Sequence, residues 1–324
     1  MQALILAAGK STRTYPLTLT RPKPLLKAAN KTLLEHNLDN LNNIVDEVII
    51  IVGYKKDLIK KYIGNKHKNL KIKYVEQKQQ LGTAHALSVA EPYIKDRFIL
   101  FMGDDIYSKE DIRKCIKHRY SILTAKTKNS QNFGVVIEKN GILVDFIEKP
   151  KKFISNLIST ASYSLDKDIF QYIKQIKKSK RNEYEFPDVL RFLSKEQNVY
   201  CIKSKQWLPV VHPKDLLKAD NTLRGNKNLI GKNSKIYGKV KNSSIGDNCI
   251  VKGSVKNSII MGETIIDKNS IIKDSVIGEN AYIDGKVLNS IVADNAKLRN
   301  VVVKGCKIWP NKIISNKTIK GDVT

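Results

Sequence analysis

The C-terminal third of the chain repeats a short pattern that leaves little freedom in how it can fold. From Leu229 onward, an aliphatic residue is followed by a small or acidic residue, two polar residues and another small residue. The segments that follow this pattern begin at Ile230, Ile245, Ile266, Ile277 and Val292. Such a hexapeptide repeat is typical of a parallel β-helix, in which the aliphatic residue of each unit points into a prism-shaped core.

Asparagine recurs in these segments in a way that fits the corners of such a prism. It occupies the fourth position of each one, at Asn233, Asn248, Asn269, Asn280 and Asn295. Asn adopts the left-handed backbone conformation more readily than other residues with a side chain, which suits a tight corner. Asn-Ser pairs at Asn242, Asn257 and Asn289, with Asp274-Ser275 between them, mark a longer period that insertions interrupt. We therefore expect residues 229–324 to form a left-handed parallel β-helix domain.

Residues 1–224 have a different pattern, in which short apolar runs alternate with helical stretches. The expected strands are Ala3–Leu6, Glu47–Val52, Ile72–Val75, Phe98–Met102, Ser121–Ala125 and Val135–Glu138, and helical spacing appears in Leu33–Leu41, Lys55–Ile63 and Leu216–Leu223. Such alternation predicts an α/β domain, similar to a Rossmann fold, around a mostly parallel sheet. The polar stretch 224–228 is the expected boundary before the β-helix.

A glycine turn follows the first expected strand, and the cations Arg13, Arg21 and Lys23 come soon after it. The run Leu6-Ala7-Ala8-Gly9-Lys10-Ser11-Thr12-Arg13 is followed by Pro16-Leu17-Thr18 and then by Arg21-Pro22-Lys23-Pro24. Phosphates bind at the carboxyl ends of strands in open α/β sheets, and the amides of residues 8–12 can form an anion nest there. Arg13 and Lys23 can then neutralise charge that shifts during phosphoryl or nucleotidyl transfer.

This segment resembles the signature of the sugar-1-phosphate nucleotidylyltransferases, L-A-A-G-x-G-T-R followed by P-L-T and P-K-P. Ser11 stands where that family usually has a second glycine. The resemblance implies that Leu6, Ala8, Gly9, Ser11 and Thr12 bind the nucleotide, with Arg13 and Lys23 as catalytic cations. A phosphate loop of the G-x-x-x-x-G-K-[ST] kind is disfavoured, because Leu4 occupies its first glycine position and Pro16 interrupts the helix that must follow.

Asp104 is the candidate metal ligand. It follows the apolar run Phe98–Met102, so it lies at the carboxyl end of an expected strand, on the same sheet edge as Gly9. A hard carboxylate there can hold Mg²⁺ between phosphate oxygens. A turn aspartate after a strand is the alternative. In the family that the signature resembles, the matching aspartate is a catalytic metal ligand, so we expect Asp104 to bind Mg²⁺.

The segment from Gln77 to Ala84 resembles the base-reading segment of the same family. A glutamine amide offers a donor and an acceptor together, which matches the imide edge of uracil or thymine. Gly82 allows the backbone to approach a flat base, and Thr83 follows it. The guanylyl-transferring branch usually has an acidic residue at the position of Gln77, so the resemblance favours UTP or dTTP as the nucleotide.

Three further segments resemble the sugar-reading part of the family. Gly134 in Phe133-Gly134-Val135-Val136, Glu148 in Glu148-Lys149-Pro150, and Tyr163 are the expected sugar-binding residues. Lys149 would hold the sugar phosphate as it attacks the α-phosphorus, and pyrophosphate would leave. The implied substrates are a nucleoside triphosphate with glucose 1-phosphate or N-acetylglucosamine 1-phosphate. A mannose-1-phosphate guanylyltransferase is an alternative.

Several positions depart from the family pattern. Pro209 stands where the family has its second metal-binding aspartate, and Val211 stands where it has a glycine. Ser159 and Ala161 replace the Asn and Gly of an N-x-G-x-Y motif. Asp105, Asp188 or Asp215 could supply the missing oxygen ligand. The alternative is a catalytically impaired homologue that binds a nucleotide or a sugar nucleotide as a regulatory subunit.

Composition limits the partners and the cellular compartment that we expect for the chain. The 324 residues carry a net charge of +27 from 58 basic and 31 acidic residues, and the excess is spread over the whole chain. A diffuse lysine coat favours solubility and anionic substrates, so we expect no specific nucleic-acid partner. Scattered cysteines, short apolar runs and no signal peptide predict a cytoplasmic protein that does not cross a membrane.

The repeat domain itself is expected to serve assembly. Acetyl transfer in a β-helix usually relies on a histidine base, and all five histidines precede the repeats. The segment Lys307–Lys312 resembles the terminal coil of pyrophosphorylases that use a β-helix to assemble. Homo-oligomer contacts through the stacked faces are therefore expected.

Overall fold

A computed structural model describes residues 1–179 and 181–324, which fall into two compact units. The first unit comprises Met1–Gly9 and Leu34–Leu208, and the second comprises Lys10–Leu33 and Pro209–Thr324. Residues 10–33, which carry most of the signature segment, therefore cluster with the C-terminal part of the chain. The domain boundary expected at residues 224–228 stays a prediction, and each unit is described by itself below.

The first unit is built on a 10-stranded sheet of order β10-β11-β13-β9-β12-β7-β1-β4-β6-β5. Its parallel centre consists of β7 (Phe98–Met102), β1 (Gln2–Ala7), β4 (Glu47–Val52) and β6 (Leu70–Glu76). In register, Leu6 pairs with Ile51 on one side and with Met102 on the other. Parallel strands end at one edge, so the residues that follow β1, β4, β6 and β7 meet there.

Antiparallel strands extend this parallel centre. They are β5 (Lys66–His67), β9 (Ser121–Lys126), β10 (Gly134–Lys139), β11 (Ile142–Glu148) and β12 (Leu157–Leu165), whereas β13 (Tyr200–Lys203) runs parallel to β9. A separate two-stranded ribbon pairs β8 (Ile106–Tyr107) with β14 (Trp207–Leu208). The sheet is therefore mixed, and the edge at which the sequence predicts phosphate binding lies in its parallel part.

Alternation along the strands divides the side chains of the first unit between the two faces of the sheet. Leu4 and Leu6 of β1 join Ile49, Ile51, Phe98 and Leu100 in one fully apolar cluster. Helices α3 (Thr83–Ser88), α5 (Ile169–Ile173) and α6 (Phe186–Glu196) contribute Leu87, Phe170 and Leu190 to the same cluster. The remaining helices are α1 (Leu33–Leu41), α2 (Lys56–Ile63) and α4 (Lys109–Cys115).

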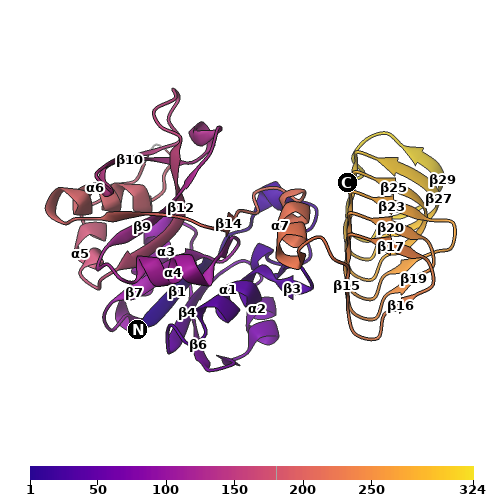
Figure 1. Cartoon of the computed structure of the whole chain (residues 1–324), viewed down its shortest axis with the longest axis horizontal. Helices are drawn as coiled ribbons and strands as arrows, with labels where there is room; N and C mark the ends of the chain where they lie inside the picture. The colour runs from indigo at the N-terminus through magenta and orange to yellow at the C-terminus, as the bar shows by residue number, and fades with distance from the viewer. Residues whose placement is uncertain (180) are drawn as a thin grey trace. The chain divides into compact units, whose positions relative to one another are not determined.

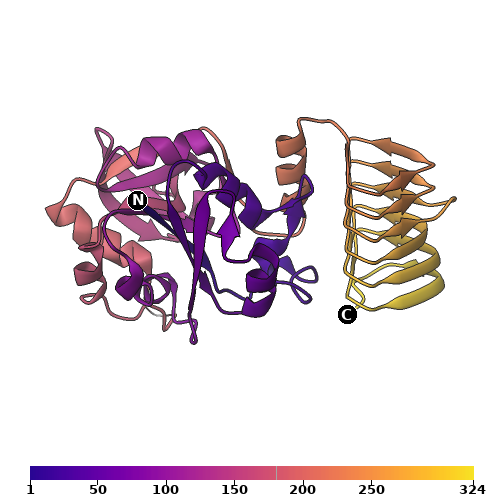
Figure 2. The ribbon, with the colours of Figure 1, turned by 90° about the horizontal axis from the view of Figure 1, so that it is seen from below.

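The second unit contains the parallel β-helix, whose short strands stack coil upon coil in Figures 1 and 2. One face is the 6-stranded sheet β15-β18-β21-β24-β26-β28, and a 9-stranded sheet supplies the others. The strands of the first face are β15 (Leu229–Ile230), β18 (Ser244–Ile245), β21 (Ile259–Ile260), β24 (Val276–Ile277), β26 (Ile291–Val292) and β28 (Lys307–Ile308). Those of the second sheet are β16 (Lys235–Ile236), β17 (Lys239–Lys241), β19 (Ile250–Val251), β20 (Ser254–Lys256), β22 (Ile265–Ile266), β23 (Ile271–Lys273), β25 (Tyr282–Leu288), β27 (Lys297–Lys304) and β29 (Ile313–Ile319).

Two kinds of stack hold the coils in register. Aliphatic side chains at equivalent positions, such as Ile245, Ile260 and Ile277, lie one above another in the core. A ladder of buried serines runs beside them: the backbone amide of Ser258 donates to the hydroxyl of Ser243 at 3.1 Å, and the amide of Ser275 donates to Ser258 at 3.1 Å. The serines thus satisfy backbone groups that the corner would otherwise bury unpaired.

The expected asparagine corners are found with one exception. Asn233, Asn248, Asn280 and Asn295 have φ values from 54° to 60°, and Asn242, Asn257, Asp274 and Asn289 have φ of 48° or 49°. Asn269 is absent from the positive-φ residues. At that corner the amide of Ser270 donates instead to the carbonyl of Asp267 at 3.0 Å. The fold class predicted from the sequence, an α/β domain followed by a parallel β-helix, is confirmed.

The rest of the second unit consists of the N-terminal segment and one helix. The segment contains two 3₁₀ turns, Thr12–Thr14 and Lys23–Leu25, and a small ribbon of β2 (Lys27–Ala28) and β3 (Lys31–Thr32). Helix α7 (Asp215–Arg224) ends at Gly225, which takes the left-handed conformation usual after a helix. Among residues 1–179 and 181–324, no helix is long and apolar enough to cross a membrane.

Shortening one core side chain of the β-helix tests this packing. Ile277 is fully buried, so Ile277→Ala is expected to lower the free energy of unfolding by about 2–5 kcal/mol. Ile230, which is 45% exposed at the first coil, provides the matched control. Its substitution by Ala should cost less than about 0.5 kcal/mol in urea denaturation followed by circular dichroism. Equal losses in the two variants would contradict the assigned core.

Candidate active site

The carbonyl oxygen of Ala8 organises the edge of the parallel sheet in the first unit. It accepts hydrogen bonds from the backbone amide of Tyr54 at 3.0 Å and from Nε2 of Gln80 at 3.2 Å. These donors lie beyond the ends of β4 and β6. Gly53 fits between them, because a Cβ at that position would lie 2.8 Å from the same carbonyl. The turn after β1 is therefore fixed by two neighbouring strand ends, and Leu6 and Ala8 are buried.

Asp104 lies just beyond β7, beside the end of β1. The amide of Gly103 donates to the carbonyl of Leu6 at 2.9 Å, which fixes the turn that carries Asp104. Asp104 is half-buried, and the next residue, Asp105, accepts a hydrogen bond from Nε1 of Trp207 at 3.0 Å. Burial raises the pKa of Tyr107, and the nearby carboxylates of Asp105 and Asp104 raise it further. Tyr107 therefore stays protonated, and its hydroxyl donates to the carbonyl of Thr160 at 2.8 Å.

Gln77 is buried at the end of β6, where its amide contacts two neighbours. Its Nε2 lies 3.0 Å from Nδ1 of His85 and 3.3 Å from the carbonyl of Gly82. Burial lowers the pKa of His85, so the ring is neutral at pH 7 and Nδ1 can accept from Gln77. Both protons of the amide are then engaged, and its oxygen is the group that remains to accept from a base.

Residues 184–186 pack against the segment that follows Gln77. Gly82 has φ of 104°, and a Cβ there would lie 2.4 Å from the carbonyl of Tyr184. The amide of Ala84 donates to that carbonyl at 3.0 Å, and the amide of Phe186 donates to the hydroxyl of Thr83 at 3.1 Å. Glycine is thus required at position 82, both for the backbone conformation and for the close approach.

The sugar-side residues come from the antiparallel part of the sheet. Gly134 pairs with Glu148 across β10 and β11. A Cβ on Gly134 would lie 2.3 Å from Cζ of Phe146 and 2.9 Å from Oε2 of Glu148, so only glycine leaves room for that carboxylate. Lys149 follows with φ of 46°, and its Nζ lies 3.6 Å from Oε1 of Glu148.

Tyr163 lies between residues that the sequence assigns to sugar binding and residues that contact the expected base-reading segment. Its hydroxyl lies 2.9 Å from Oγ of Ser159, and its ring lies 4.9 Å from the ring of Phe186. Burial raises the pKa of Tyr163; the hydrogen bond with Ser159 opposes the shift and the charge of Glu148 adds to it. Ala161, between these residues, has φ of 57°, which is the conformation that the family glycine would adopt without strain.

Arg181 and Glu185 also belong to this region. Glu185 lies in an acidic stretch before a helix, residues 183–188, whose spacing fits the family, whereas no sequence motif identified Arg181. Arg181 donates to both carboxylate oxygens of Glu185, at 3.1 and 2.7 Å, and its Nη2 lies 3.7 Å from Oε1 of Glu148. Burial is the largest influence and opposes ionisation of Glu185, but the hydrogen bonds of Arg181 and Ser179 and the charges of Arg181 and Lys149 together lower its pKa. Their four-residue spacing is too common a pattern to be recognised in the sequence alone.

The signature segment from Lys10 onward lies in the second unit, and threonines hold its turn in shape. Ser11 has φ of 52° and ψ of 52°, so this position requires the left-handed conformation that glycine would favour. Its carbonyl accepts hydrogen bonds from the hydroxyls of Thr14 at 2.7 Å and Thr18 at 2.9 Å. Thr12 and Arg13 are exposed, whereas Lys23 is only 5% exposed.

The segment that departs most from the family pattern offers little to a metal. Proline has no side-chain oxygen, so Pro209 cannot act as a ligand. The amides of Val211 and His212 donate to Asp215, at 2.9 and 2.7 Å, so this carboxylate is engaged by the loop that precedes its helix. Among residues 1–179 and 181–324, no group of three or more His, Cys, Asp or Glu side chains could hold a metal ion.

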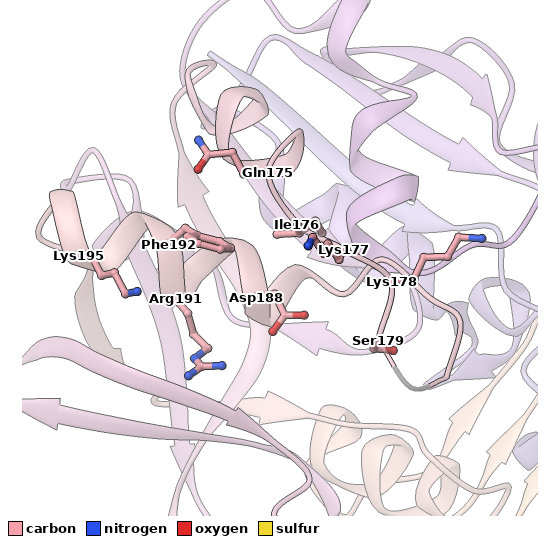
Figure 3. Close-up of a pocket in the computed structure, with 9 residues that line it drawn as sticks. All are labelled: Gln175, Ile176, Lys177, Lys178, Ser179, Asp188, Arg191, Phe192 and Lys195. Atoms are coloured by element: carbon pink, nitrogen blue, oxygen red, sulfur yellow. The ribbon is translucent and has the colours of Figure 1, made fainter.

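A separate surface pocket of about 420 Å³ lies between the end of α5 and helix α6 (Figure 3). Cationic side chains dominate its lining, and Asp188 and Phe192 also face it: Gln175, Ile176, Lys177, Lys178, Ser179, Asp188, Arg191, Phe192 and Lys195. Burial raises the pKa of Asp188, and the neighbouring Glu185 adds to the shift. Asp188, which the sequence offers as an alternative metal ligand, lines this pocket, whereas the expected nucleotide-binding and sugar-binding residues do not.

Comparison with known proteins agrees with this geometry. The profile of the nucleotidyl transferase family matches residues 2–226, and a profile described as the GMPPB C-terminal domain matches residues 219–324. The chain therefore belongs to the nucleotidyl transferase family, and the resemblance found in the signature segment is confirmed.

Named relatives come from several organisms. The chain is 37% identical over 275 residues to the bifunctional protein GlmU of Methanocaldococcus jannaschii, an alignment that covers 84% of this chain and 61% of that protein. It thus spans about three fifths of the GlmU relatives that it matches. It is 30% identical over 236 residues to the UTP–glucose-1-phosphate uridylyltransferase AglF of Haloferax volcanii, covering 69% of this chain and 97% of that protein.

A solved structure supports the fold assignment. The crystal structure of a protein described as a glucose-1-phosphate thymidylyltransferase from Bacillus anthracis, in complex with sucrose, superposes with a TM-score of 0.63. The two sequences are 25% identical, and the superposition covers 69% of this chain and 96% of that chain.

A pair of glycine substitutions tests the closure of the Tyr184 loop over Gly82. Gly82→Ala places a methyl group against the Tyr184 carbonyl, so we expect nucleotide affinity to fall at least about tenfold in calorimetry. Gly141 is the matched control, because its φ of 78° carries the same backbone strain but nothing lies within 4 Å of its added Cβ. Unchanged affinity in Gly82→Ala, or an equal loss in Gly141→Ala, would contradict the role of this close approach.

The contact between Gln77 and His85 predicts a pH dependence. The folded pKa of His85 lies below its ordinary value of 6.5, so the neutral ring stabilises the fold above pH 6.5, and this contribution is lost as the pH falls through the folded pKa. Because a protonated ring cannot accept from Gln77, nucleotide affinity should be constant above pH 6.5 and decline below it. His85→Asn retains an acceptor and should remove the decline; an identical decline in that variant would exclude His85 as its source.

Proposed function

We propose that this chain transfers a nucleotidyl group from a nucleoside triphosphate to a hexose 1-phosphate and releases pyrophosphate. The observation that carries the proposal is that Asp104, Gln77 and Tyr163 come from one sheet of the first unit. Asp104 follows β7 and Gln77 follows β6, where these parallel strands end, and Tyr163 of β12 pairs with Leu100 of β7. Family membership supports the same reaction class.

Mg²⁺ is the cofactor that fits the residues present. It is bound in many phosphate sites by one or two carboxylates, several waters and the substrate phosphates, so no dedicated cluster of protein ligands is needed. The half-buried Asp104 supplies one such carboxylate, and the neighbouring Asp105 is held by Trp207. The ion would neutralise negative charge on the phosphates, alongside the cationic side chains of the protein.

The reaction needs no covalent enzyme intermediate. An oxygen of the sugar 1-phosphate attacks the α-phosphorus in line, the bond from that phosphorus to the oxygen bridging to the β-phosphate breaks, and pyrophosphate leaves with the electron pair. Lys149 would hold the attacking phosphate, and Glu148 would accept hydrogen bonds from sugar hydroxyls. Arg13 and Lys23, on the signature segment, would neutralise the triphosphate together with the amides of residues 8–12. Catalysis is then positioning and charge neutralisation.

The proposed nucleotide is UTP or dTTP, and the proposed sugar is glucose 1-phosphate or N-acetylglucosamine 1-phosphate. The free amide oxygen of Gln77 can accept from the imide N–H of uracil or thymine. A guanylyltransferase is the second candidate. It is favoured by the match to the GMPPB C-terminal profile and by 32% identity over 230 residues to the mannose-1-phosphate guanylyltransferase catalytic subunit beta of Dictyostelium discoideum.

We further propose that the β-helix mediates homo-oligomer contacts. Its outward surface carries exposed apolar side chains, among them Tyr237 at 70% and Ile313 at 72% exposure. The stacked faces of its parallel coils suit symmetric packing between copies of the chain.

The test is pyrophosphate release with Mg²⁺, with each of five nucleoside triphosphates paired with the common hexose 1-phosphates. Release is expected with one pairing and should fall at least about a hundredfold in Asp104→Ala. Asp57→Ala, at an exposed position on α2, is the control and should retain full activity. No release with any pairing, together with nucleotide binding in calorimetry, would mean that Pro209 and the accompanying changes have ended catalysis and that the chain is a binding subunit.

A further inference from the structure

Arg21 attaches the signature segment to the β-helix within the second unit. It is the first residue of the Arg21-Pro22-Lys23-Pro24 run, two positions before the proposed catalytic Lys23. Its guanidinium lies 2.5 Å from Oδ2 of Asp294 and 2.8 Å from Oε1 of Glu279. The hydroxyl of Thr20 donates to the same oxygen of Asp294 at 2.5 Å, and Nζ of Lys27 lies 3.4 Å from Glu279.

The hexapeptide repeat places Glu279 and Asp294 next to each other in successive coils. Glu279 and Asp294 occupy the same position in successive hexads, and the amide of Glu279 donates to Oδ1 of Asp294 at 2.8 Å. The two oxygens of Asp294 are therefore divided, one serving the β-helix and one serving Arg21 and Thr20. The corner of the β-helix thus presents to Arg21 an Asp294 carboxylate that the repeat itself holds in position.

A second attachment lies at the other end of the segment. Nδ2 of Asn30 donates to the carbonyl of Ile245 at 2.8 Å, and the amide of Ala29 donates to Oδ1 of Asp220 at 2.8 Å. The hydroxyl of Ser244, beside Ile245 on β18, donates to that oxygen at 2.5 Å. Residues 20–30 are therefore tied to the β-helix at both ends.

Burial makes the Arg21 contacts energetically important. The side chains of Arg21 and Asp294 are 14% and 8% exposed. Burial alone would lower the pKa of Arg21, but the carboxylates of Glu279 and Asp294 raise the pKa above its ordinary value. Burial likewise opposes ionisation of Glu279, but the nearby Arg21 lowers the pKa of this carboxyl group. Removing one member of such a group leaves an uncompensated buried charge, which is more costly than the loss of a surface ion pair.

We propose that the β-helix positions the nucleotide-binding segment, with Arg21 as the positioning residue that transmits its effect to Lys23 and Arg13. The proposal rests on the function proposed above and assigns the repeat domain a role beyond assembly. A domain that served assembly alone would not require buried, charge-matched contacts with the segment that carries the catalytic cations.

The test combines hydrogen exchange with kinetics on the full chain. In Asp294→Asn and in Arg21→Gln, the amides of residues 14–26 should exchange faster, because their turn hydrogen bonds, such as Leu26 to Lys23 at 2.9 Å, depend on the attached segment. The KM for the nucleoside triphosphate should rise by about tenfold to a hundredfold, and Arg21→Lys should recover part of the loss. Where no turnover is detectable in the wild type, nucleotide affinity from calorimetry takes the place of KM, so failure of the proposed function does not remove the test.

A matched control separates positioning from general damage to the repeat. Asp267→Asn changes another hexad carboxylate, whose contacts are with Tyr282 and the amide of Lys268, and it should leave exchange and KM unchanged. Arg21→Gln leaves every hexad intact, so it remains informative if Asp294→Asn disturbs the β-helix. Unchanged exchange in residues 14–26, or faster exchange with unchanged nucleotide affinity, would overturn the proposal.

Discussion

The site of the first unit depends on one carbonyl group at the end of its first strand. The oxygen of Ala8 accepts from the amide of Tyr54 and from the side chain of Gln80, which come from the ends of β4 and β6. With the hydrogen bond from Gly103 to Leu6, it fixes the relative positions of the strand ends on which the expected metal ligand and base reader stand. Catalysis by positioning requires this rigidity, because small displacements of reacting groups are costly.

The sequence predicted the parallel centre of the sheet and the β-helix well. Apolar runs define β4 and β7 with the observed bounds, and the hexads define the coils, because burial on a regular period leaves a pattern in the sequence. Strands β11 and β12 were not expected. The residues of β11 are partly exposed and alternate less clearly, whereas β12 is buried but contains several Ser and Thr residues, so it shows no apolar run. The contacts of Arg21 with Asp294 and of Arg181 with Glu185 join residues by tertiary packing, which no local pattern records.

Two departures from the family pattern concern chemistry less than backbone. Ser11 and Ala161 stand where the family has glycine, and both adopt positive φ values, of 52° and 57°. The backbone conformation is thus kept at the cost of some strain, about 1–3 kcal/mol at each position. Hydrogen bonds from Thr14 and Thr18 to Ser11, and from the Ala161 amide to Ser159, hold these residues in place. Pro209 is different, because no backbone adjustment can supply a carboxylate.

The central claim is that the chain joins a nucleotide to a sugar phosphate, and the most direct measurement is phosphorus NMR of the products. With Mg²⁺, a nucleoside triphosphate and the matching hexose 1-phosphate, the account predicts the paired resonances of a sugar–nucleotide diphosphate together with pyrophosphate in equal amount. Nucleotide and sugar signals that remain unchanged with every pairing, under conditions in which calorimetry shows both ligands bound, would contradict it.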